Sequence, residues 1–348
     1  MTNLSVSENL QGSSYRPLVA RGEKGYLVVW ITEGETIELH CVHYDENKNA
    51  QREHVISTLD MDDEPYALFY IGGDRYLLAI EETIGNKIYI LGQTGETIGC
   101  HYLSQQGIIV NVFRKESYYY LFTFEDGSVH ICKTPIAEPN WSKMETIVTH
   151  GWEIYSIPSV FDMGDSYCIA WLTAEDQLDY VYNPYVYADG KMTIKTQSLG
   201  NFMVDYLLSA KVSPSEIAFS GYSSSERIFR TLYVKSEGNC LVETSNRYWK
   251  THDYHNRSFY VSPLRNGFML MTDGPEEGSQ VCYQRFTRGN TFLHFLKTAD
   301  SDVVSPTSTP EFASGNGDGL LVYVKDFGDY SQICGKWITI SEIPELDS

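Results

Sequence analysis

Short runs of apolar residues recur along the chain at intervals of about 49 residues. Nearly every position in these runs is apolar, whereas a strand with one exposed face would alternate between apolar and polar residues. Such unbroken runs are typical of strands that are buried on both faces. No segment of 12 or more residues has a convincing helical period, so we predict an all-β protein. The seven runs are residues 26–30, 76–80, 118–122, 167–171, 217–219, 268–271 and 320–324.

Two of these runs belong to longer segments that align without a gap. In each segment a proline is followed nine residues later by a tyrosine, and four residues after that by a tryptophan. The segments lie 141 residues apart, which is three periods of 47 residues. A fixed period of this length indicates an internal structural repeat. The matching triplets are Pro17, Tyr26, Trp30 and Pro158, Tyr167, Trp171.

Each repeat has room for four short strands. A first strand, often introduced by a proline, precedes the apolar run and is separated from it by a turn containing Gly or Asp. After the run, an acidic turn leads to a third strand, such as residues 37–42. Another turn leads to a fourth strand, such as residues 191–195. Four strands in about 49 residues is the size of one β-propeller blade.

The pattern resembles the β-propeller superfamily over almost the whole chain. It lacks the Trp-Asp dipeptide of WD40 repeats and the sialidase Asp box, and the glycine pair of kelch repeats occurs only at Gly72 and Gly73. The proline, tyrosine and tryptophan register loosely resembles bacterial propeller lectins and sensors, a likeness of architecture that implies no function. The resemblance implies a single domain, residues 1–348, with seven four-stranded antiparallel blades. These are expected to start near residues 15, 64, 107, 154, 202, 257 and 303.

The last repeat ends with its third strand, residues 332–340, and has no obvious fourth strand. Residues 3–7 at the other end of the chain form an isolated strand-like segment that could supply it. We therefore predict that this N-terminal strand closes the ring and removes a free sheet edge. The alternative is a frayed N-terminus.

The acidic residues are expected to gather at one end of the blades. The chain has 46 acidic and 26 basic residues and a net charge of −20, so nucleic acids and anionic membranes are poor candidates as partners. Antiparallel strands place the turns after the second strands at one end, and these 35 residues hold 14 acids and one basic residue. Turns at the other end mix both signs. Although turns favour Asp on conformational grounds, nine of the 14 acids are Glu.

Aromatic residues accompany these acids in the loops between blades, where exposed Trp and Tyr can anchor a partner. Alternatively, they cap the core. Our preferred hypothesis is a monomeric, non-enzymatic module that binds a basic protein or peptide on its acidic face. The residues expected at that face are Asp62, Asp63, Glu64, Glu81, Glu82, Glu125, Asp126, Trp152, Glu175, Asp176, Trp249, Tyr254, Glu276 and Glu277.

Two other functions stay open at this stage. A carbohydrate-binding lectin would use the Trp and Tyr content and repeated shallow sites. A glycoside hydrolase would need two carboxylates near the axis, for which Glu64, Glu153 and Asp205 are candidates. His252 and His255 have no identifiable third metal ligand. No Gly-x-Ser-x-Gly or phosphate-binding motif is present, and we expect no metal or cofactor.

The seven cysteines are spread singly, with no Cys-x-x-Cys pair. Most lie in apolar strand-like runs, where a reduced thiol behaves as a small hydrophobic side chain. The N-terminal residues show no secretory signal, and no apolar run is long enough to cross a membrane. These features favour a cytoplasmic protein, or one delivered to a host cytosol without a standard signal peptide.

Overall fold

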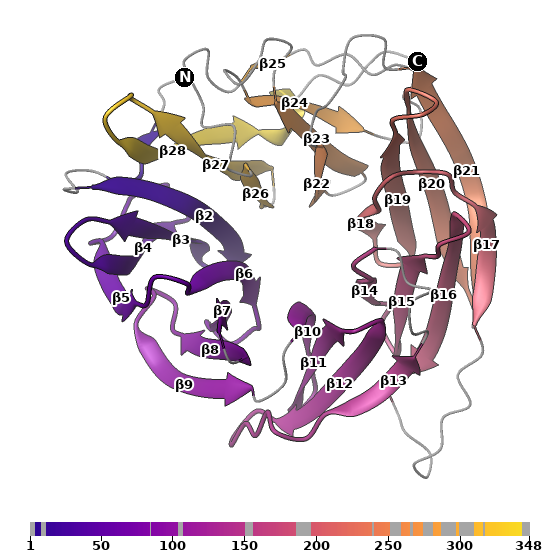
Figure 1. Cartoon of the computed structure of the whole chain (residues 1–348), viewed down its shortest axis with the longest axis horizontal. Helices are drawn as coiled ribbons and strands as arrows, with labels where there is room; N and C mark the ends of the chain where they lie inside the picture. The colour runs from indigo at the N-terminus through magenta and orange to yellow at the C-terminus, as the bar shows by residue number, and fades with distance from the viewer. Residues whose placement is uncertain are drawn as a thin grey trace. The chain divides into compact units, whose positions relative to one another are not determined.

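The computed structural model of the chain is built almost entirely from β-strands (Figure 1). The one helical element described is a 3-10 turn, η2 (Ile340–Glu342). Among the residues that the structure describes, none forms a helix that could span a membrane. The described residues are 4–7, 12–83, 85–103, 107–149, 156–185, 196–238, 240–250, 259–264, 267–273, 281–286, 297–298, 310–315 and 317–342.

The chain divides into two compact units. The first comprises residues 1–106, 271–283 and 295–344, and the second comprises residues 107–270, 284–294 and 345–348. Each is described by itself below.

Two complete sheets of the first unit consist of four strands that follow one another in both sequence and space. One contains β2 (Ser13–Gly22), β3 (Gly25–Glu33), β4 (Ile37–Asp45) and β5 (His54–Leu59). The next contains β6 (Glu64–Tyr70), β7 (Tyr76–Glu82), β8 (Gly85–Leu91) and β9 (Thr97–Leu103).

The second unit repeats the same four-stranded plan three times. Its sheets are β10 (Ile108–Lys115), β11 (Tyr118–Glu125), β12 (Ser128–Pro135), β13 (Glu145–Thr149); β14 (Ser159–Asp162), β15 (Ser166–Leu172), β16 (Gln177–Pro184), β17 (Gln197–Asn201); and β18 (Leu208–Ser213), β19 (Glu216–Ser223), β20 (Ile228–Glu237), β21 (Cys240–Lys250). The predicted fourth strand at residues 191–195 lies outside the described residues, and β17 takes that place in the sheet.

A further sheet has the order β22 (Phe259–Leu264), β23 (Gly267–Asp273), β24 (Val281–Phe286), β25 (Lys297–Thr298). The last sheet combines the two ends of the chain, in the order β1 (Leu4–Ser5), β28 (Ser331–Thr339), β27 (Asp318–Asp326), β26 (Glu311–Ser314). The predicted count of seven four-stranded units is therefore confirmed.

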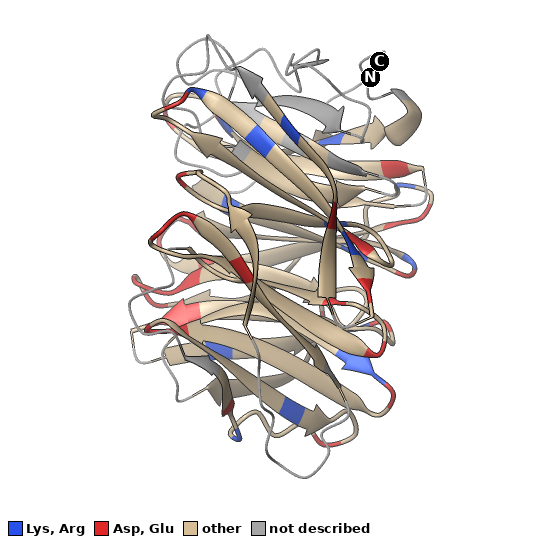
Figure 2. Ribbon diagram, turned by 90° about the vertical axis from the view of Figure 1, so that its right-hand side faces the viewer, with Lys and Arg blue, Asp and Glu red and all other residues tan. Residues whose placement is uncertain are grey.

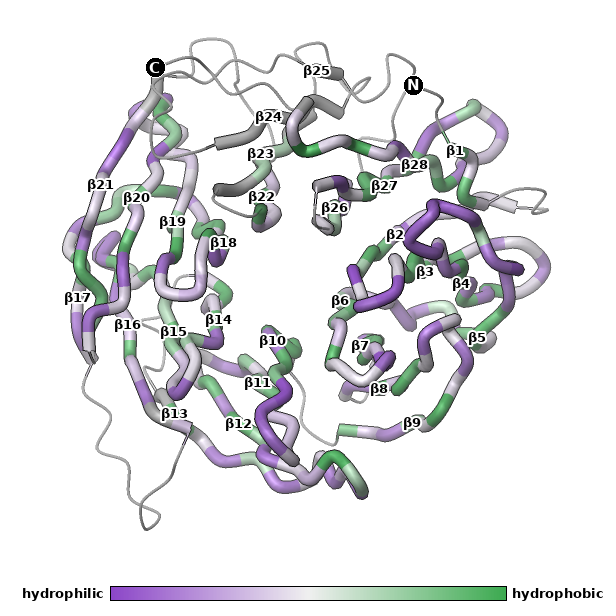
Figure 3. Tube along the Cα trace, turned by 180° about the vertical axis from the view of Figure 1, so that it is seen from behind, coloured by the Kyte–Doolittle hydropathy of each residue, from purple (hydrophilic) through white to green (hydrophobic). Residues whose placement is uncertain are grey.

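The N-terminal strand completes the last sheet, as predicted, and Figure 3 shows β1 beside β28. Leu4 lies opposite Gly335, and the Val6 backbone N–H donates to the Ile333 carbonyl at 2.9 Å. In return, the Ile333 N–H donates to Ser7 Oγ at 2.9 Å. Val6 is buried in the apolar cluster beside this sheet. Backbone pairing and burial together hold the edge that β28 would otherwise expose.

The second strand of each complete sheet is apolar throughout because both of its faces are buried. In β3, Val28 and Trp30 pack in a cluster with Leu320 of β27. Their neighbours in sequence, such as Val29, pack on the opposite face in a cluster with residues of β7. In the second unit, β15 likewise contributes alternate residues to two clusters. Both faces of these strands are buried, and Figure 3 shows hydrophilic positions in turns and along outer strands such as β21.

Bulges in the first strands explain the positions of the prolines in the repeat. Pro17 lies within the register shift between Tyr15 and Leu18 of β2, and Pro65 lies at the shift in β6. Proline cannot donate to a sheet ladder, so strands accept it at their first residues or at bulges. The proline signal in the sequence therefore marks the bulged start of the first strand.

Candidate interaction surface

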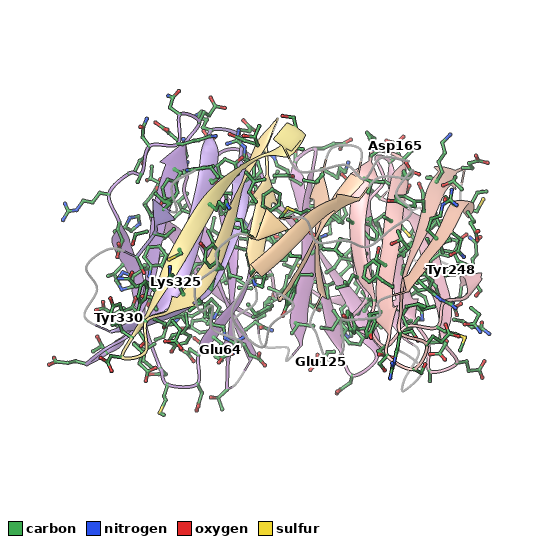
Figure 4. All side chains as sticks on the ribbon, turned by 90° about the horizontal axis from the view of Figure 1, so that it is seen from above. Glu64, Glu125, Asp165, Tyr248, Lys325 and Tyr330 are labelled. Atoms are coloured by element: carbon green, nitrogen blue, oxygen red, sulfur yellow. The ribbon has the colours of Figure 1, made fainter. Side chains whose placement is uncertain are left out.

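The antiparallel strands place different turns at the two ends of each sheet. Within each unit, the turns between second and third strands share one end, here called the acidic end of that unit; in the first unit the loop at residues 60–63 lies at this end too. The turns between first and second strands lie at the opposite end. In the first unit, Glu64 and Tyr330 lie at the same end (Figure 4). In the second unit, Glu125 and Asp165 lie at opposite ends.

In the first unit, ten described acidic residues and three basic residues lie at or next to the acidic end. Glu33, Glu35, Asp62 and Glu81 are exposed, and no ion pair is found for them among the described residues. Figure 2 shows acidic positions gathered in the hairpin turns, while most of the strand surface is uncharged. The ten acids are Glu33, Glu35, Asp60, Asp62, Asp63, Glu64, Glu81, Glu82, Asp326 and Asp329, and the bases are Arg16, Lys87 and Lys325.

Three of the predicted contact residues in this unit already have partners within the protein. The Glu64 carboxylate lies 2.6 Å from the Arg16 guanidinium, and Glu82 lies 3.2 Å from Lys87 Nζ. Asp63 is buried, and its carboxylate accepts a hydrogen bond from the Asp60 backbone N–H at 3.1 Å. These groups stabilise the acidic end, whereas Asp62 and Glu81 present their charge to solvent.

At the acidic end of the second unit, the predicted residue Glu125 is the last residue of β11, and Asp126, Glu175 and Asp176 lie in the hairpin turns after β11 and β15. Asp126 has a φ of 47° and Asp176 a φ of 58°. Asp tolerates this left-handed conformation better than most residues, so both aspartates also have a conformational role. Glu175 is exposed, and no ion pair is found for it among the described residues.

Several predicted residues lie outside the described part of the chain. These are Trp152, Tyr254, Glu276 and Glu277, together with Glu153, His252 and His255. Trp249 is placed on β21, but its side chain lies outside the description.

The carboxylates considered for glycoside hydrolysis are occupied by other interactions. Glu64, in the first unit, pairs with Arg16. Asp205, in the second unit, accepts a hydrogen bond from the Ser224 backbone N–H at 2.8 Å, which holds the turn after β19. Across the described residues, no three His, Cys, Asp or Glu side chains are placed to bind one metal ion.

At the opposite end, several lysines form ion pairs with acids of neighbouring sheets. Lys24 Nζ lies 2.6 Å from Asp74, and Lys48 Nζ lies 3.0 Å from Asp318. The second unit has an equivalent pair, with Lys115 Nζ 2.8 Å from Asp162. These inter-sheet ion pairs neutralise part of the charge at the opposite end, as the pairs of Glu64 and Glu82 do at the acidic end.

Sequence reasoning missed a Cys–His pair on the neighbouring strands β4 and β5 of the first sheet. Cys41 Sγ lies 3.2 Å from His54 Nε2, and a side chain at Gly95 would collide with the same sulfur. Cys41 is fully buried, and burial raises the pKa of its thiol to about 12. A nucleophilic cysteine needs a thiolate, so this pair is suited to packing rather than to catalysis.

An exposed aromatic pair was also missed. Phe327 and Tyr330, in the turn between β27 and β28, are 46% and 43% exposed. Their ring centroids lie 5.2 Å apart with an interplanar angle of 12°. The signal in the sequence was two aromatic residues inside one acidic turn, Asp-Phe-Gly-Asp-Tyr.

No protein-family model matches this sequence, and no curated protein matches it. Solved structures match it closely enough in shape to decide the fold. The β-propeller domain of Cps50 (Swd1) from Myceliophteria thermophila aligns with a TM-score of 0.55 and 12% identity, over 97% of this chain and 100% of that one. The fold is a seven-bladed β-propeller.

Two further propellers show how varied such proteins are. The β-propeller domain of the Trilobed protease from Pyrococcus furiosus, described as having an open velcro topology, has a TM-score of 0.52 and 11% identity, over 96% of this chain and 100% of that one. Drosophila Plexin A, in complex with Semaphorin 1b, has a TM-score of 0.53 and 10% identity, over 97% and 87%. The propeller fold therefore includes both protease domains and proteins found in complexes. Identities this low establish the fold alone.

Proposed function

We propose that this propeller is a non-enzymatic interaction module that binds a basic protein or peptide segment at its acidic end. One observation carries the proposal: at the acidic end of the first unit the described acidic residues outnumber the basic ones, and several of the acids are exposed. Exposed carboxylates such as Glu33, Glu35 and Glu81 lack ion-pair partners among the described residues. At the opposite end, lysines such as Lys24 are held in inter-blade ion pairs.

Uncompensated carboxylates on one side of a protein attract cationic partners and orient them before contact. The chain's net charge of −20 also attracts cationic partners from a longer distance. The complex of Plexin A with Semaphorin 1b supports the proposal only by analogy of fold.

The test compares binding of a Lys- and Arg-rich peptide to the native protein and to two variants of equal net charge. E33K/E35K/E81K reverses three carboxylates at the acidic end. The matched control, E116K/E138K/E237K, reverses three exposed glutamates at the opposite end. We expect at least a tenfold loss of affinity in the first variant and less than about a twofold loss in the control, since close charges interact most strongly.

Raising the salt concentration from about 0.1 M to about 0.5 M should weaken binding to the native protein, because exposed charges are screened. Equal losses in the two variants would reduce the effect to net charge alone and contradict a surface at the acidic end. Binding that is unchanged by salt would contradict the electrostatic basis of the proposal.

A further inference from the structure

We infer that the turn between β27 and β28 is a platform that selects arginine side chains of the partner. This inference rests on the proposed function and specifies which cation is recognised. The platform consists of Phe327 and Tyr330, whose nearly parallel rings are both more than 40% exposed. Their exposure contrasts with the buried aromatic residues of the same sheet, such as Tyr323.

The turn that carries the two rings is held in one shape. The Phe327 backbone N–H donates to the Tyr330 carbonyl at 2.9 Å, and the Gly328 N–H donates to Asp326 Oδ1 at 2.7 Å. Gly328 has a φ of 90°, which glycine adopts without strain. A surface that is already ordered loses little entropy on binding, so the rings are ready for a partner.

The base of this turn is also fixed to the neighbouring blade. Ser331 Oγ donates to the Ser14 carbonyl at 2.8 Å, and Ser13 lies opposite Glu33 in the β2–β3 pairing. The segment at Ser13 and Ser14 therefore lies between the aromatic turn and the acidic turn of the first blade. As a result, the carboxylates of two turns belong to the same region of the acidic end as the rings. These are Asp326 and Asp329 in their own turn, and Glu33 and Glu35 in the turn of the first blade.

The protein itself shows that this aromatic surface accepts a cation. Lys325 Nζ lies 5.5 Å from the centroid of the Phe327 ring. A cation at this distance from a ring face is attracted by the negative potential of the π-system. Because Lys325 already lies over Phe327, a cation supplied by a partner would have the same kind of attraction to the exposed ring of Tyr330.

Arginine fits the combination of flat rings and carboxylates better than lysine. Its guanidinium group is planar and weakly hydrated, so it can stack on an aromatic ring while its edge donates to a carboxylate. A lysine ammonium is compact and strongly hydrated, and it cannot stack. A surface of carboxylates alone would distinguish the two cations far less.

The experiment uses two peptides of equal length and charge, one containing only arginine as its cation and one containing only lysine. Fluorescence anisotropy gives the affinity of each for the full chain. We expect the native protein to prefer the arginine peptide about fivefold, a ratio in the range of an exposed cation–π contact. In F327A/Y330A the ratio should fall to about one, chiefly through weaker binding of the arginine peptide.

The matched control, Y102A/Y248A, removes two other exposed tyrosines, which are 66% and 70% exposed, and it should keep the native preference. If the alanine variant fails to fold, F327L/Y330L retains apolar side chains of similar size without the ring faces. The thermal transition of each variant establishes whether it is folded.

The outcomes separate this inference from the proposed function. If both peptides bind the native protein and F327A/Y330A keeps the preference for arginine, the inference that the aromatic pair selects arginine is wrong. The proposed binding at the acidic end is then unaffected. If neither peptide binds the native protein, the proposed function fails. If oligosaccharides bind instead, and F327A/Y330A abolishes their binding, the aromatic pair is a glycan site and the inference is overturned.

Discussion

Glu311 is a carboxylic acid in an unfavourable position at the start of β26. Burial raises its pKa to about 7, from an ordinary value of 4.5. The folded protein therefore holds this proton more tightly than the unfolded chain does. By linkage, stability falls as the pH rises from about 4.5 to about 7, and above that range the loss is constant.

We predict that E311Q removes this loss. The variant should be more stable than the native protein at pH 8 by about 1–3 kcal/mol, where the upper value corresponds to the full pKa shift. At pH 4.5 the two proteins should have nearly equal stability. Urea unfolding at both pH values measures the difference. E33Q, which changes an exposed glutamate, serves as the control and should alter neither value. Equal effects of E311Q at both pH values would contradict this assignment.

At the scale of single elements, the two-residue strand β1 contributes more to the stability of the last sheet than its length suggests. It covers the edge of β28, and the adjacent Val6 adds an apolar side chain to the core. Without it, the N–H and C=O groups of β28 would face solvent as a template for another strand.

We predict that deleting residues 1–7 lowers the free energy of unfolding by about 2–4 kcal/mol, the sum of one buried Val side chain and a few backbone hydrogen bonds. The shortened protein should also self-associate as its concentration rises. Light scattering coupled to size-exclusion chromatography measures the association. V6A, which keeps the strand and removes only two methyl groups, should be less stable but remain monomeric. A monomeric deletion variant of native stability would refute the role given to β1.

At the scale of the whole molecule, net charge should control partner binding. The sequence has an isoelectric point near 4.8. We predict that affinity for a basic peptide falls as the pH is lowered from 7 towards this value, first because the nine histidines gain positive charge and then because the carboxylates begin to lose their negative charge, while the peptide keeps its own. Anisotropy at fixed ionic strength follows the change, and circular dichroism at each pH verifies that the protein is folded. Affinity that is constant over this range would argue against a contact based on carboxylates.

The propeller could be predicted from the sequence because packing constrains its second strands on both faces. Residues such as Leu27 and Trp30 are fully buried on opposite sides of β3, which leaves no position for a polar residue. The bulges that accept Pro17 and Pro65 add a second periodic signal. A pattern imposed in every blade survives even where individual residues differ.

The acidic surface was only partly predictable. Strand direction alone assigns each turn to an end; the structure places Asp62 in the loop after β5, and Glu81, predicted in a turn, in the last residues of β7. The sequence could not show that Arg16 reaches Glu64, because the two residues are far apart in sequence and Arg16 lies at a bulge with a φ of 54°. Nor could it separate the exposed Phe327 and Tyr330 from the many aromatic residues that fill the core.

The pairing of Leu4 with Gly335 has a consequence for synthesis on the ribosome. The segment at Leu4 must wait for a partner that is translated much later, while the intervening hairpins can form from neighbouring segments as they appear. Blade formation can thus proceed along the nascent chain, but the sheet that contains β1 is completed only when β28 has left the exit tunnel. Until then the waiting segment is accessible to chaperones and proteases, so the time spent translating the last blade sets how long the newborn protein is vulnerable.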